Sequence, residues 1–281
     1  MKRIGIVGLG LMGGSLAKRI RDVLPESDLF GLTASEETVK QAKNLQIFNS
    51  VSSSLSDFPT QLDIILVCTP MSILLETLQK LDTHIEGPCI FVDIGSVKQL
   101  ICEGFQAQHP EHIFVGGHPM AGNEKSGIAH SDPNLLDGRT FFLMESAQFF
   151  MDKLIPFFEA LGFRVIITTA KNHDQLVALS SHLPYLMATM TVQTAKELVS
   201  SADDFRTALG PGFRDSTRVA ASDPAWGVDV CTLNQNALLN ALEQLQEHLD
   251  SLRLQIQHND VSSLKNRFID AKAFLNKLTK G

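Results

Sequence analysis

The sequence lacks a net positive charge and any long uninterrupted apolar run. Its formal net charge is −7, which argues against non-specific nucleic-acid binding, because such binding needs a basic face. No segment has the roughly 20 consecutive apolar residues that a membrane span requires. The basic, apolar start resembles a signal peptide only superficially, because glycines interrupt it and a helical pattern follows. We therefore expect no nucleic-acid partner, no membrane association and a buried strand at the N-terminus.

Cysteine is scarce, and the cysteines that occur follow no recognisable spacing. Cys68, Cys89, Cys102 and Cys231 fit neither a disulfide framework nor a C-x-x-C metal knuckle. Scattered free thiols are typical of a reducing compartment, so we expect a cytoplasmic protein. We find no metal-ligand spacing and expect no metal site. The remaining composition, with 44% hydrophobic and 20% charged residues, is that of an ordinary globular chain.

Short apolar runs alternate with helical patterns over residues 1–170. The run DIILVC at 63–68 has little internal alternation, which is typical of a parallel strand buried on both faces. Alternation of strands and helices predicts an α/β domain with a doubly wound, mostly parallel sheet and right-handed crossovers. We predict strands at 4–8, 28–33, 63–68, 89–93, 112–117, 140–144 and 163–168, and helices that include 97–105 and 147–161.

The pattern from residue 171 to residue 281 is helical, and no convincing strand occurs there. His173 opens a long helical pattern, which Pro184 should kink because proline removes a backbone hydrogen bond. Asp223 before Pro224 looks like an N-cap followed by proline at the first helical position. We therefore expect a second, all-helical domain over 171–281.

A long helix near the C-terminus carries an apolar seam of the kind that packs against another helix. Packing inside the same domain is the simpler interpretation. The alternative is a subunit interface, which the apolar surface of this half would suit, so a homodimer is our expectation. The seam consists of Leu238, Leu242, Leu245, Leu249, Leu252 and Ile256.

A glycine-rich segment directly follows the first predicted strand and opens a helix. In that context a G-x-G-x-x-G pattern indicates a dinucleotide site. Its glycines allow a tight turn, approach of the backbone to a pyrophosphate at a helix N-terminus, and close helix–strand packing. A glycine-rich corner without a ligand is the alternative. The residues are Gly8, Leu9, Gly10, Leu11, Met12 and Gly13.

The end of the second predicted strand normally selects between the two nicotinamide cofactors. An acid there binds the ribose 2′-hydroxyl of NAD, but this chain has Thr33. No acid repels a 2′-phosphate and no adjacent arginine attracts one. Glu36 and Glu37 come later and should solvate the start of a helix. Both NAD and NADP stay open, with a slight preference for NADP.

Three further segments should converge with the glycine turn, because the residues that follow parallel strands lie on one edge of the sheet. Thr69 and Pro70 follow one strand, Ser96 lies in GSVK after the next, and His118 follows a third. This topology places Thr69, Ser96 and His118 near a nicotinamide. Simpler alternatives exist, because Thr69 and Ser96 could each cap the helix that follows it.

His118 is the strongest of these candidates. It follows a buried strand between glycines and Pro119, so we expect it on a stiff turn, held in position as a functional histidine is. An ordinary loop residue is the alternative. Lys98 should be solvent-exposed in a first helical turn. His182, taken alone, fits a buried histidine with satisfied hydrogen bonds.

Two arginines in the helical half suit an anionic ligand. Arg214 and Arg218 are four residues apart, so they share a face if the segment is helical, and two cations on one face fit a carboxylate. Surface pairing with Asp215 or with glutamates is the alternative. Trp226, the single tryptophan, could pack in the core or against a substrate.

Together these motifs resemble the prephenate and arogenate dehydrogenase family of tyrosine biosynthesis, over nearly the whole chain. The resemblance rests on VGLGLMGGSLA, LVCTP, DIGSVK, GGHPMAGNEKSG, HD followed by SHLP, and FRDSTRVA before DPAW. The combination of GSVK with GGHPMAG is its specific part. The resemblance implies a Rossmann domain followed by a helical dimerisation domain. It also implies oxidative decarboxylation of a cyclohexadienyl acid, with hydride transfer to NAD or NADP.

The resemblance further implies roles for individual residues. His118 would accept the proton of the substrate's C4 hydroxyl as a neutral imidazole, and Ser96 would bind the same region. Arg218 would bind a substrate carboxylate, with Arg214 as a weaker candidate. His182 would lie near the substrate at the interface of the domains.

One position departs from the family pattern. Many relatives read SHLPH where this chain reads SHLPY, so Tyr185 stands at a position that could hold a substrate-side histidine. The choice between prephenate, a keto acid, and arogenate, an amino acid, therefore stays open.

The resemblance also implies that Thr69 would line the nicotinamide pocket. The chain leaves no room for a fused chorismate mutase or regulatory domain, so any feedback by tyrosine would act at the active site.

Two other functions are weaker candidates. A β-hydroxyacid dehydrogenase or imine reductase would use a catalytic lysine in a glycine-rich helical motif, and here Lys171 is present without the glycines. A dinucleotide-sensing protein without catalysis would have lost His118 or Ser96, and both are intact. Prephenate dehydrogenase is therefore our main prediction, and arogenate dehydrogenase is the alternative.

Overall fold

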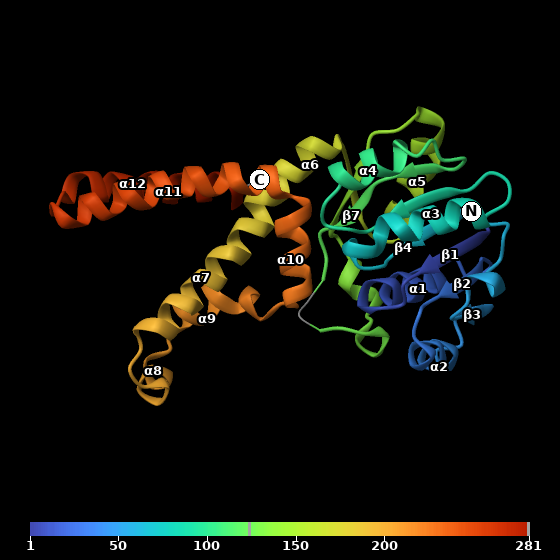
Figure 1. Ribbon diagram of the computed structural model, residues 1–281, viewed down its shortest axis with the longest axis horizontal. Coiled ribbons are helices and arrows are strands. Elements are labelled where there is room, and N and C mark those ends of the chain that lie inside the picture. The colour runs from blue at the N-terminus through green and yellow to red at the C-terminus, as the bar shows by residue number, and fades with distance from the viewer. Residues whose placement is uncertain (123–124, 280–281) are drawn as a thin grey trace. The chain divides into compact units, whose positions relative to one another are not determined.

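The computed structural model describes residues 1–122 and 125–279. The chain divides into two compact units, Met1–Gln235 and Asn236–Gly281. The first unit contains all the strands of the described residues and the helices up to α10 (Figure 1). None of the described helices is long and apolar enough to cross a membrane.

A parallel sheet of six strands forms the centre of the first unit, in the order β3-β2-β1-β4-β5-β6. The strand β4 (Ile64–Val67) is buried at every position, as the continuous apolar run predicts. The fold prediction of a doubly wound α/β sheet is confirmed. The other strands are β1 (Arg3–Val7), β2 (Asp28–Leu32), β3 (Ser50–Ser52), β5 (Ile90–Asp93) and β6 (Ile113–Val115).

Helices cover both faces of this sheet, because side chains from successive positions of each strand point to opposite faces. The even-numbered side chains Ile4, Ile6, Ile64 and Leu66 pack with α1, α2 and α5. Phe91, Ile65 and Val67 pack on the other face, against α3 and α4. The helices are α1 (Leu11–Val23), α2 (Glu36–Asn44), α3 (Leu74–His84), α4 (Gln99–Gln106) and α5 (Gln148–Ala160).

A second, three-stranded sheet follows, in the order β7-β8-β9. Its strands are β7 (Gly117–Pro119), β8 (Thr140–Met144) and β9 (Arg164–Thr168), with β7 antiparallel to β8. The prediction of one continuous strand over 112–117 was wrong, because the chain leaves the parallel sheet after Val115 and pairs with β8 from Gly117 onward. The predicted strands at 140–144 and 163–168 exist, but they belong to this second sheet.

The rest of the first unit is helical, as predicted. The helix from Ala170 is interrupted by a π-helical turn at Ala178–His182, which ends two residues before Pro184, near the position where the sequence predicts a kink. Asp223 caps α10 by accepting a hydrogen bond from the backbone of Ala225, and this cap is also confirmed. The helices are α6 (Ala170–Val177), α7 (Leu183–Leu198), α8 (Ala202–Ala208), α9 (Pro211–Thr217) and α10 (Pro224–Leu233).

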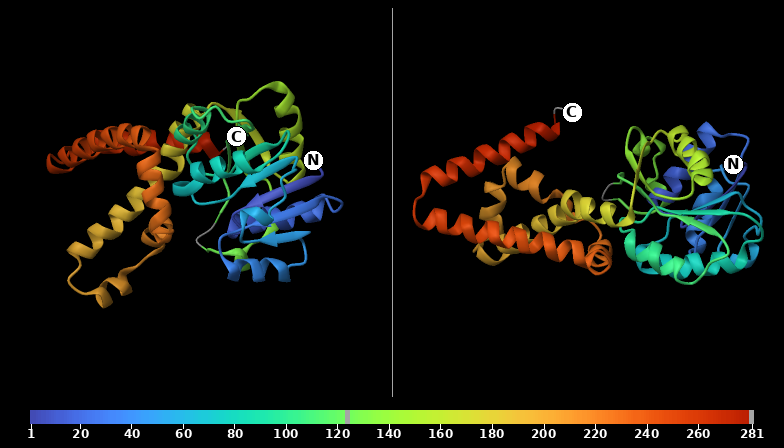
Figure 2. Two further views of the ribbon diagram at one scale, coloured as in Figure 1. Left: turned by 45° about the vertical axis from the view of Figure 1, so that its right-hand side comes forward. Right: turned by 90° about the horizontal axis from the view of Figure 1, so that it is seen from above.

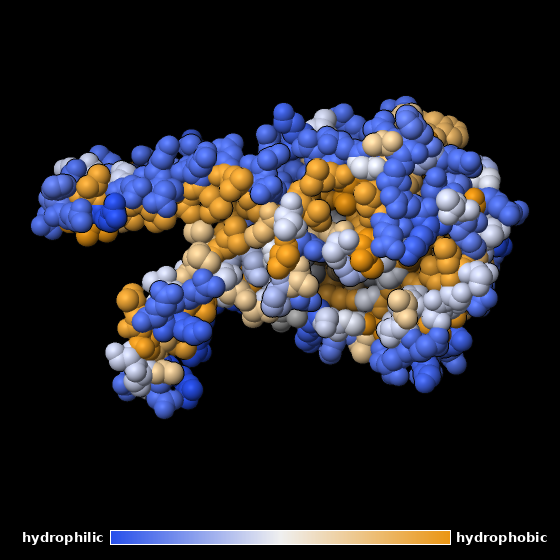
Figure 3. Space-filling view, viewed as in Figure 1, coloured by the Kyte–Doolittle hydropathy of each residue, from blue (hydrophilic) through white to orange (hydrophobic). Residues whose placement is uncertain are grey.

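The second unit contains two long helices, α11 (Gln235–Gln257), which begins at the last residue of the first unit, and α12 (Val261–Thr279). Near their connection, Arg267 donates hydrogen bonds to Gln255 and Ser251. The two helices then diverge (Figure 2), so α12 does not cover the length of the α11 seam. Figure 3 shows apolar residues gathered on one side of these helices. Side chains that are half or more exposed include Leu254, Ile256, Val261, Phe268, Ile269, Phe274, Leu275 and Leu278.

Candidate active site

The glycine turn after β1 has the geometry that a bound pyrophosphate requires. Gly8 has a φ of 94°, and a Cβ there would lie 2.6 Å from the backbone of Cys68. A Cβ on Gly13 would overlap the carbonyl oxygen of Gly8, whereas a Cβ on Gly10 would meet nothing within 4 Å. The backbone at Gly10 is therefore open to a ligand beside the N-terminus of α1. Among the other predicted members, Leu9 is buried, and Leu11 and Met12 begin α1.

The first turn of α2, shortly after β2, carries a carboxylate that a reading of the strand end alone does not suggest. Thr33 follows β2 and donates a backbone hydrogen bond to the carbonyl of Ser52 at 3.1 Å. Glu36, in the first turn of α2, accepts a hydrogen bond from the hydroxyl of Ser53, which follows β3. The Ser53 contact thus ties Glu36 to the carboxyl edge of the sheet, where an adenosine ribose would lie.

Thr69 and Pro70 lie beside the glycine turn, since a Cβ on Gly8 would come within 2.8 Å of the Thr69 nitrogen. The alternative role of Thr69 as a helix cap was wrong. The N-cap of the short helix at Met71–Ile73 is Pro70, and no side chain caps it. The hydroxyl of Thr69 is buried and has no hydrogen-bond partner within the described residues. It is therefore available to a ligand at this edge.

Ser96 does not cap helix α4, so that alternative was also wrong. The helix begins at Gln99, and the carboxylate of Asp174 caps it by accepting from the backbone nitrogens of Lys98 (2.8 Å) and Gln99 (2.9 Å). The hydroxyl of Ser96 instead accepts a hydrogen bond of 2.9 Å from the indole of Trp226. Ser96 is thereby joined to a residue of α10 that is 130 positions away.

Lys98 is fully buried, and the prediction of an exposed lysine was wrong. Its ammonium forms an ion pair with Asp93 and donates to the carbonyl of Gly117 at 2.9 Å. Asp93 also accepts from the backbone nitrogens of Gly95 (2.8 Å) and Gly117 (3.0 Å). This pair therefore fastens three segments together: the end of β5, the turn that carries Ser96, and the strand that carries His118.

His118 lies in the strand β7 rather than on a turn, which corrects our expectation. It is paired with Phe142 of β8 and is 9% exposed. A Cβ on Gly117 would lie 2.6 Å from the carbonyl oxygen of Asp93, so only glycine lets the strand approach β5 this closely. The GGHPMAGNEKSG motif continues through Asn123 and Glu124, which lie outside the described residues.

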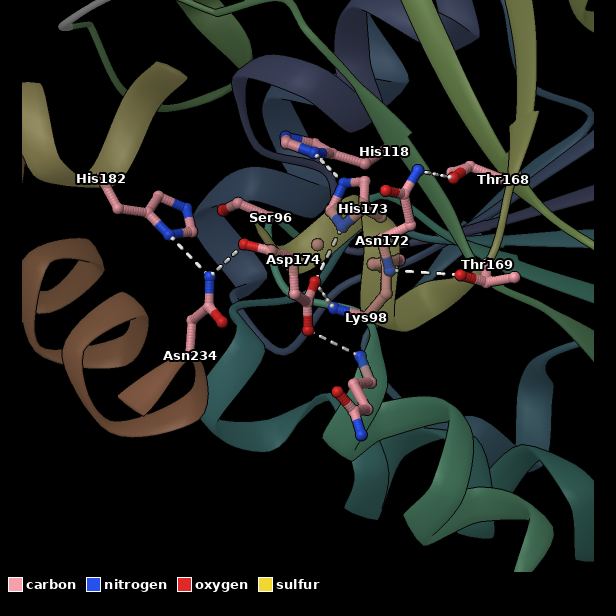
Figure 4. Close-up of polar contacts among 12 residues, drawn as sticks. Ser96, Lys98, His118, Thr168, Thr169, Asn172, His173, Asp174, His182 and Asn234 are labelled. Carbon is pink, nitrogen blue, oxygen red and sulfur yellow. Dashed lines mark hydrogen bonds and ion pairs between the residues drawn. The ribbon is translucent and has the colours of Figure 1, made fainter. Parts of the chain in front are cut away.

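A chain of hydrogen bonds runs from Asp174 through His173 to His118 (Figure 4). Nδ1 of His173 lies 2.8 Å from the Asp174 carboxylate, and Nε2 of His173 lies 2.8 Å from Nδ1 of His118. The same oxygen of Asp174 accepts a hydrogen bond from the backbone nitrogen of Lys98. It therefore acts as an acceptor, and Nδ1 of His173 must be the donor to it. With Nδ1 of His173 donating to the carboxylate, Nε2 of His173 accepts from Nδ1 of His118, and Nε2 of His118 keeps a lone pair. Across residues 1–122 and 125–279, Nε2 of His118 has no hydrogen-bond partner.

The surroundings of His118 keep this imidazole neutral. Burial is the main cause that holds the pKa of His118 well below its usual 6.5, and the neighbouring His173, Lys98 and His182 lower it further. Burial also lowers the pKa of His182 to about 4. Both side chains are therefore neutral at physiological pH, and His118 has the form that a general base needs.

His182 is completely buried on the π-helical turn, at the edge of the same network. Its ring lies edge-on to Trp226, with centroids 5.8 Å apart. Asn234 approaches Nδ1 of His182 at 3.2 Å and donates to the carbonyl of Asp174 at 2.9 Å. Nε2 of His182 is buried and has no partner in the part of the chain that the structure describes.

The two arginines predicted to bind an anion are not part of this hydrogen-bond network. Arg214 is on α9 and Arg218 follows that helix directly, and both are exposed. Within the described residues neither guanidinium has an ion pair, so the alternative of pairing with Asp215 is wrong. Tyr185 packs edge-on against Trp226 at 5.1 Å between ring centroids, and its ring fills the space that a side chain at Gly227 would need.

Sequence reasoning missed several members of the network: Asp93, His173, Asp174 and Asn234. The dipeptide His173-Asp174 was visible as part of a motif, but its spacing to His118 gives no sign of contact. Asp93 ends a predicted strand just before GSVK. This proximity to Lys98 is a sequence signal from which the buried ion pair could have been predicted. Asn234 has no sequence signal, because it acts through contacts 52 and 60 residues away.

Two family models match consecutive parts of the chain. One is described as the nucleotide-binding domain of prephenate dehydrogenase and matches residues 16–167. The other is described as the dimerization domain of prephenate dehydrogenase and matches residues 169–269. Together they cover most of the chain.

Individual relatives agree with these models. The chain is 32% identical to a prephenate dehydrogenase of Lactococcus lactis, over 97% of this chain and 76% of the relative. Its structure is similar to that of prephenate dehydrogenase from Aquifex aeolicus in complex with hydroxyphenyl propionate and NAD+, with a TM-score of 0.91, 28% identity and coverage of 99% and 98%. It is also similar to Synechocystis arogenate dehydrogenase, with a TM-score of 0.83, 31% identity and coverage of 99% and 100%.

Proposed function

The chain belongs to the prephenate dehydrogenase family, and from this and the site geometry we propose that it converts prephenate to 4-hydroxyphenylpyruvate and CO₂ with NAD+. The observation that carries the proposal is the hydrogen-bond chain that leaves one lone pair, on Nε2 of the buried His118. A neutral imidazole at the carboxyl edge of a dinucleotide-binding sheet suits removal of a hydroxyl proton during hydride transfer.

Bound NAD+ would accept the hydride from C4 of the substrate. Nε2 of His118 accepts the proton of the C4 hydroxyl as that hydride leaves. The bond to the ring carboxylate breaks with release of CO₂, its electron pair moves into the ring and makes it aromatic, and His118 returns the proton to the oxygen at C4. Asp174 and His173 hold the imidazole of His118 in the required tautomer. The hydroxyl of Ser96, oriented by the hydrogen bond from Trp226, would bind the substrate close to its C4 hydroxyl.

The glycine turn at residues 8–13 is our proposed site for the pyrophosphate, because the space at Gly10 is open and α1 begins there. The unpartnered hydroxyl of Thr69 supports a place beside the nicotinamide. The family model and the NAD+ complex of the relative support NAD+, against the slight preference for NADP drawn from Thr33. The carboxylate of Glu36 supports the same choice, since it would repel a 2′-phosphate.

Arg218 is our proposed ligand for a substrate carboxylate, with Arg214 beside it. Their exposure and lack of an ion pair within the described residues support this, because each guanidinium is free to bind an anion. His182 and Tyr185 complete the proposed substrate side. We place the cofactor-binding domain at 1–170 and the helical domain at 171–281, and the two family models, which end at 167 and begin at 169, support that boundary.

We also propose a homodimer that forms through the helical domain. The dimerization family model and the exposed apolar side chains of α11 and α12 support it. A cytoplasmic location is proposed because the four cysteines form no disulfide in the described residues.

Arogenate dehydrogenase is the second candidate, because Tyr185 leaves the choice between the two substrates open and the similarity to the Synechocystis enzyme favours arogenate. The test is a matrix of initial rates with prephenate and arogenate, each with NAD+ and NADP+. The proposal expects the highest kcat/KM for prephenate with NAD+. A highest value with arogenate would assign the second candidate, and no turnover in any combination would contradict both.

A further inference from the structure

His182 has a buried nitrogen that the protein itself leaves unsatisfied. The side chain is 0% exposed, and Nε2 has no partner within the described residues. Buried polar atoms in proteins nearly always have hydrogen-bond partners, so an exception at a candidate active site marks a place for a ligand atom. In Figure 4 this nitrogen is on the side of the ring that faces Ser96 and His118.

Asn234 determines whether that nitrogen donates or accepts. The side-chain amide lies 2.9 Å from the backbone carbonyl of Asp174. A carbonyl only accepts, so the group of Asn234 that faces it must be the NH₂ group and not the amide oxygen. The same NH₂ group lies 3.2 Å from Nδ1 of His182. Nδ1 therefore accepts, and the single proton of neutral His182 is on Nε2.

We propose that Asn234 is a positioning residue: its amide, oriented by the carbonyl of Asp174, holds His182 as a hydrogen-bond donor that recognises a carboxylate oxygen of the substrate. The inference rests on the proposed function, because it requires an acid substrate beside His118. Asp174 then directs both histidines. Its carboxylate, through His173, leaves His118 an acceptor for a hydroxyl, and its carbonyl, through Asn234, leaves His182 a donor.

The neutrality of His182 makes Asn234 necessary. An imidazolium would donate from both nitrogens whatever its neighbours, but burial lowers the pKa of His182 to about 4, with His173 adding to this and Asp174 opposing it. Only the tautomer decides what a neutral ring offers to the substrate. With the proton on Nδ1, a lone pair on Nε2 would face the carboxylate and repel it.

The test is Asn234→Asp, which replaces the donor by an acceptor of nearly the same shape. The introduced carboxylate would accept a hydrogen bond from Nδ1 of His182, so the neutral ring would present a lone pair to the substrate. We expect KM for prephenate near pH 8 to rise about tenfold or more, the scale of a lost hydrogen bond to a charged group. Lowering the pH should protonate His182 beside the new carboxylate and reduce KM again, whereas the wild-type KM should stay flat from pH 8 to pH 6.

Two readouts separate this role from a structural one. The kcat and the Kd for NAD+, measured by fluorescence titration, should change little in Asn234→Asp. KM for arogenate, if it is turned over, should rise as much as KM for prephenate, since both carry carboxylates. A KM independent of pH in the variant, or a rise confined to prephenate, would contradict the assignment. The matched control is Asn172→Ala, which removes the 2.8 Å hydrogen bond from an exposed asparagine to Thr168 and should change none of these values.

The tautomer can also be measured without any variant. In the full-length wild-type protein labelled with ¹⁵N-histidine, NMR should show the proton of His182 on Nε2 near pH 7. A proton on Nδ1 would overturn the proposal even if Asn234→Asp fails to fold. This measurement needs no turnover, so a protein that is inactive on prephenate but has the Nε2 tautomer would contradict the proposed function and not the positioning by Asn234.

Discussion

The surroundings of His118 and those of Arg218 are built in opposite ways. Around His118 the side chains of Asp93, Lys98 and His173 are buried and paired, and each hydrogen bond orients the next group. Around Arg218 the guanidinium is exposed and has no ion pair in the described residues. Under the proposed function, His118 would be oriented for proton transfer before the substrate arrives, whereas Arg218 would acquire its ionic partner from the substrate.

The largest effect on turnover is expected from replacing His118, because the substitution removes the lone pair on its Nε2. His118→Asn keeps a polar side chain but supplies no base, and general-base catalysis is typically worth about 10²–10⁴-fold. We expect kcat to fall by that factor in steady-state assays while the Kd for NAD+ stays close to wild type. His130→Asn is the control, since His130 is exposed at the end of a short helix. Near-normal turnover of His118→Asn would remove His118 from the mechanism.

A second substitution tests whether the buried charges hold the site together. Lys98→Met leaves the carboxylate of Asp93 buried without its partner, and breaking a buried ion pair in this way typically costs about 3–5 kcal/mol. We expect a lower free energy of unfolding in urea, partly restored when Asp93→Asn is added. Lys80→Met, which breaks an exposed pair with Glu76, should change stability little. Equal losses in the free energy of unfolding for Lys98→Met and Lys80→Met would contradict a stabilising role of the buried ion pair beside His118.

The smallest effect is expected on the open side. Arg218→Ala should raise KM for prephenate by about tenfold or more, the scale of a lost hydrogen bond to a charged group, with kcat changed less. Arg214→Ala should raise KM less than Arg218→Ala. Arg206→Ala is the control, because Arg206 is an exposed arginine paired with Asp203 on α8. An unchanged KM in Arg218→Ala would exclude that residue from the substrate site.

The sequence predicts the frame of the site better than its hydrogen bonds. Parallel topology predicts that the glycine turn, Thr69 and Ser96 lie at one edge of the sheet, whereas the place of His118 in β7 also depends on pairing with β8. Local patterns also locate the cap at Asp223 and the irregular turn before Pro184. What a helix start cannot reveal is which residue caps it: Ser96 is adjacent, yet Asp174 caps α4 from 75 positions away.

The same limit explains the misplaced lysine. The position of Lys98 in a first helical turn predicts a solvent-exposed side chain. Only the fold reveals that its ammonium contacts Asp93 and the carbonyl of Gly117. The strand at 112–117 was mispredicted for a related reason, since the switch between sheets after Val115 depends on pairing with β8. Tertiary contacts decided each of these cases against the local pattern.

The pH dependence of kcat/KM tests whether a neutral, buried His118 is the base, because kcat/KM reports the ionisation of the free enzyme's base. Protonation removes the lone pair of His118, and burial together with His173, Lys98 and His182 holds its pKa well below 6.5. We expect kcat/KM for prephenate with NAD+ to stay constant from pH 8 down to about pH 6 and to fall only below that. An acid limb centred at or above pH 6.5 would contradict a neutral, buried His118 as the base.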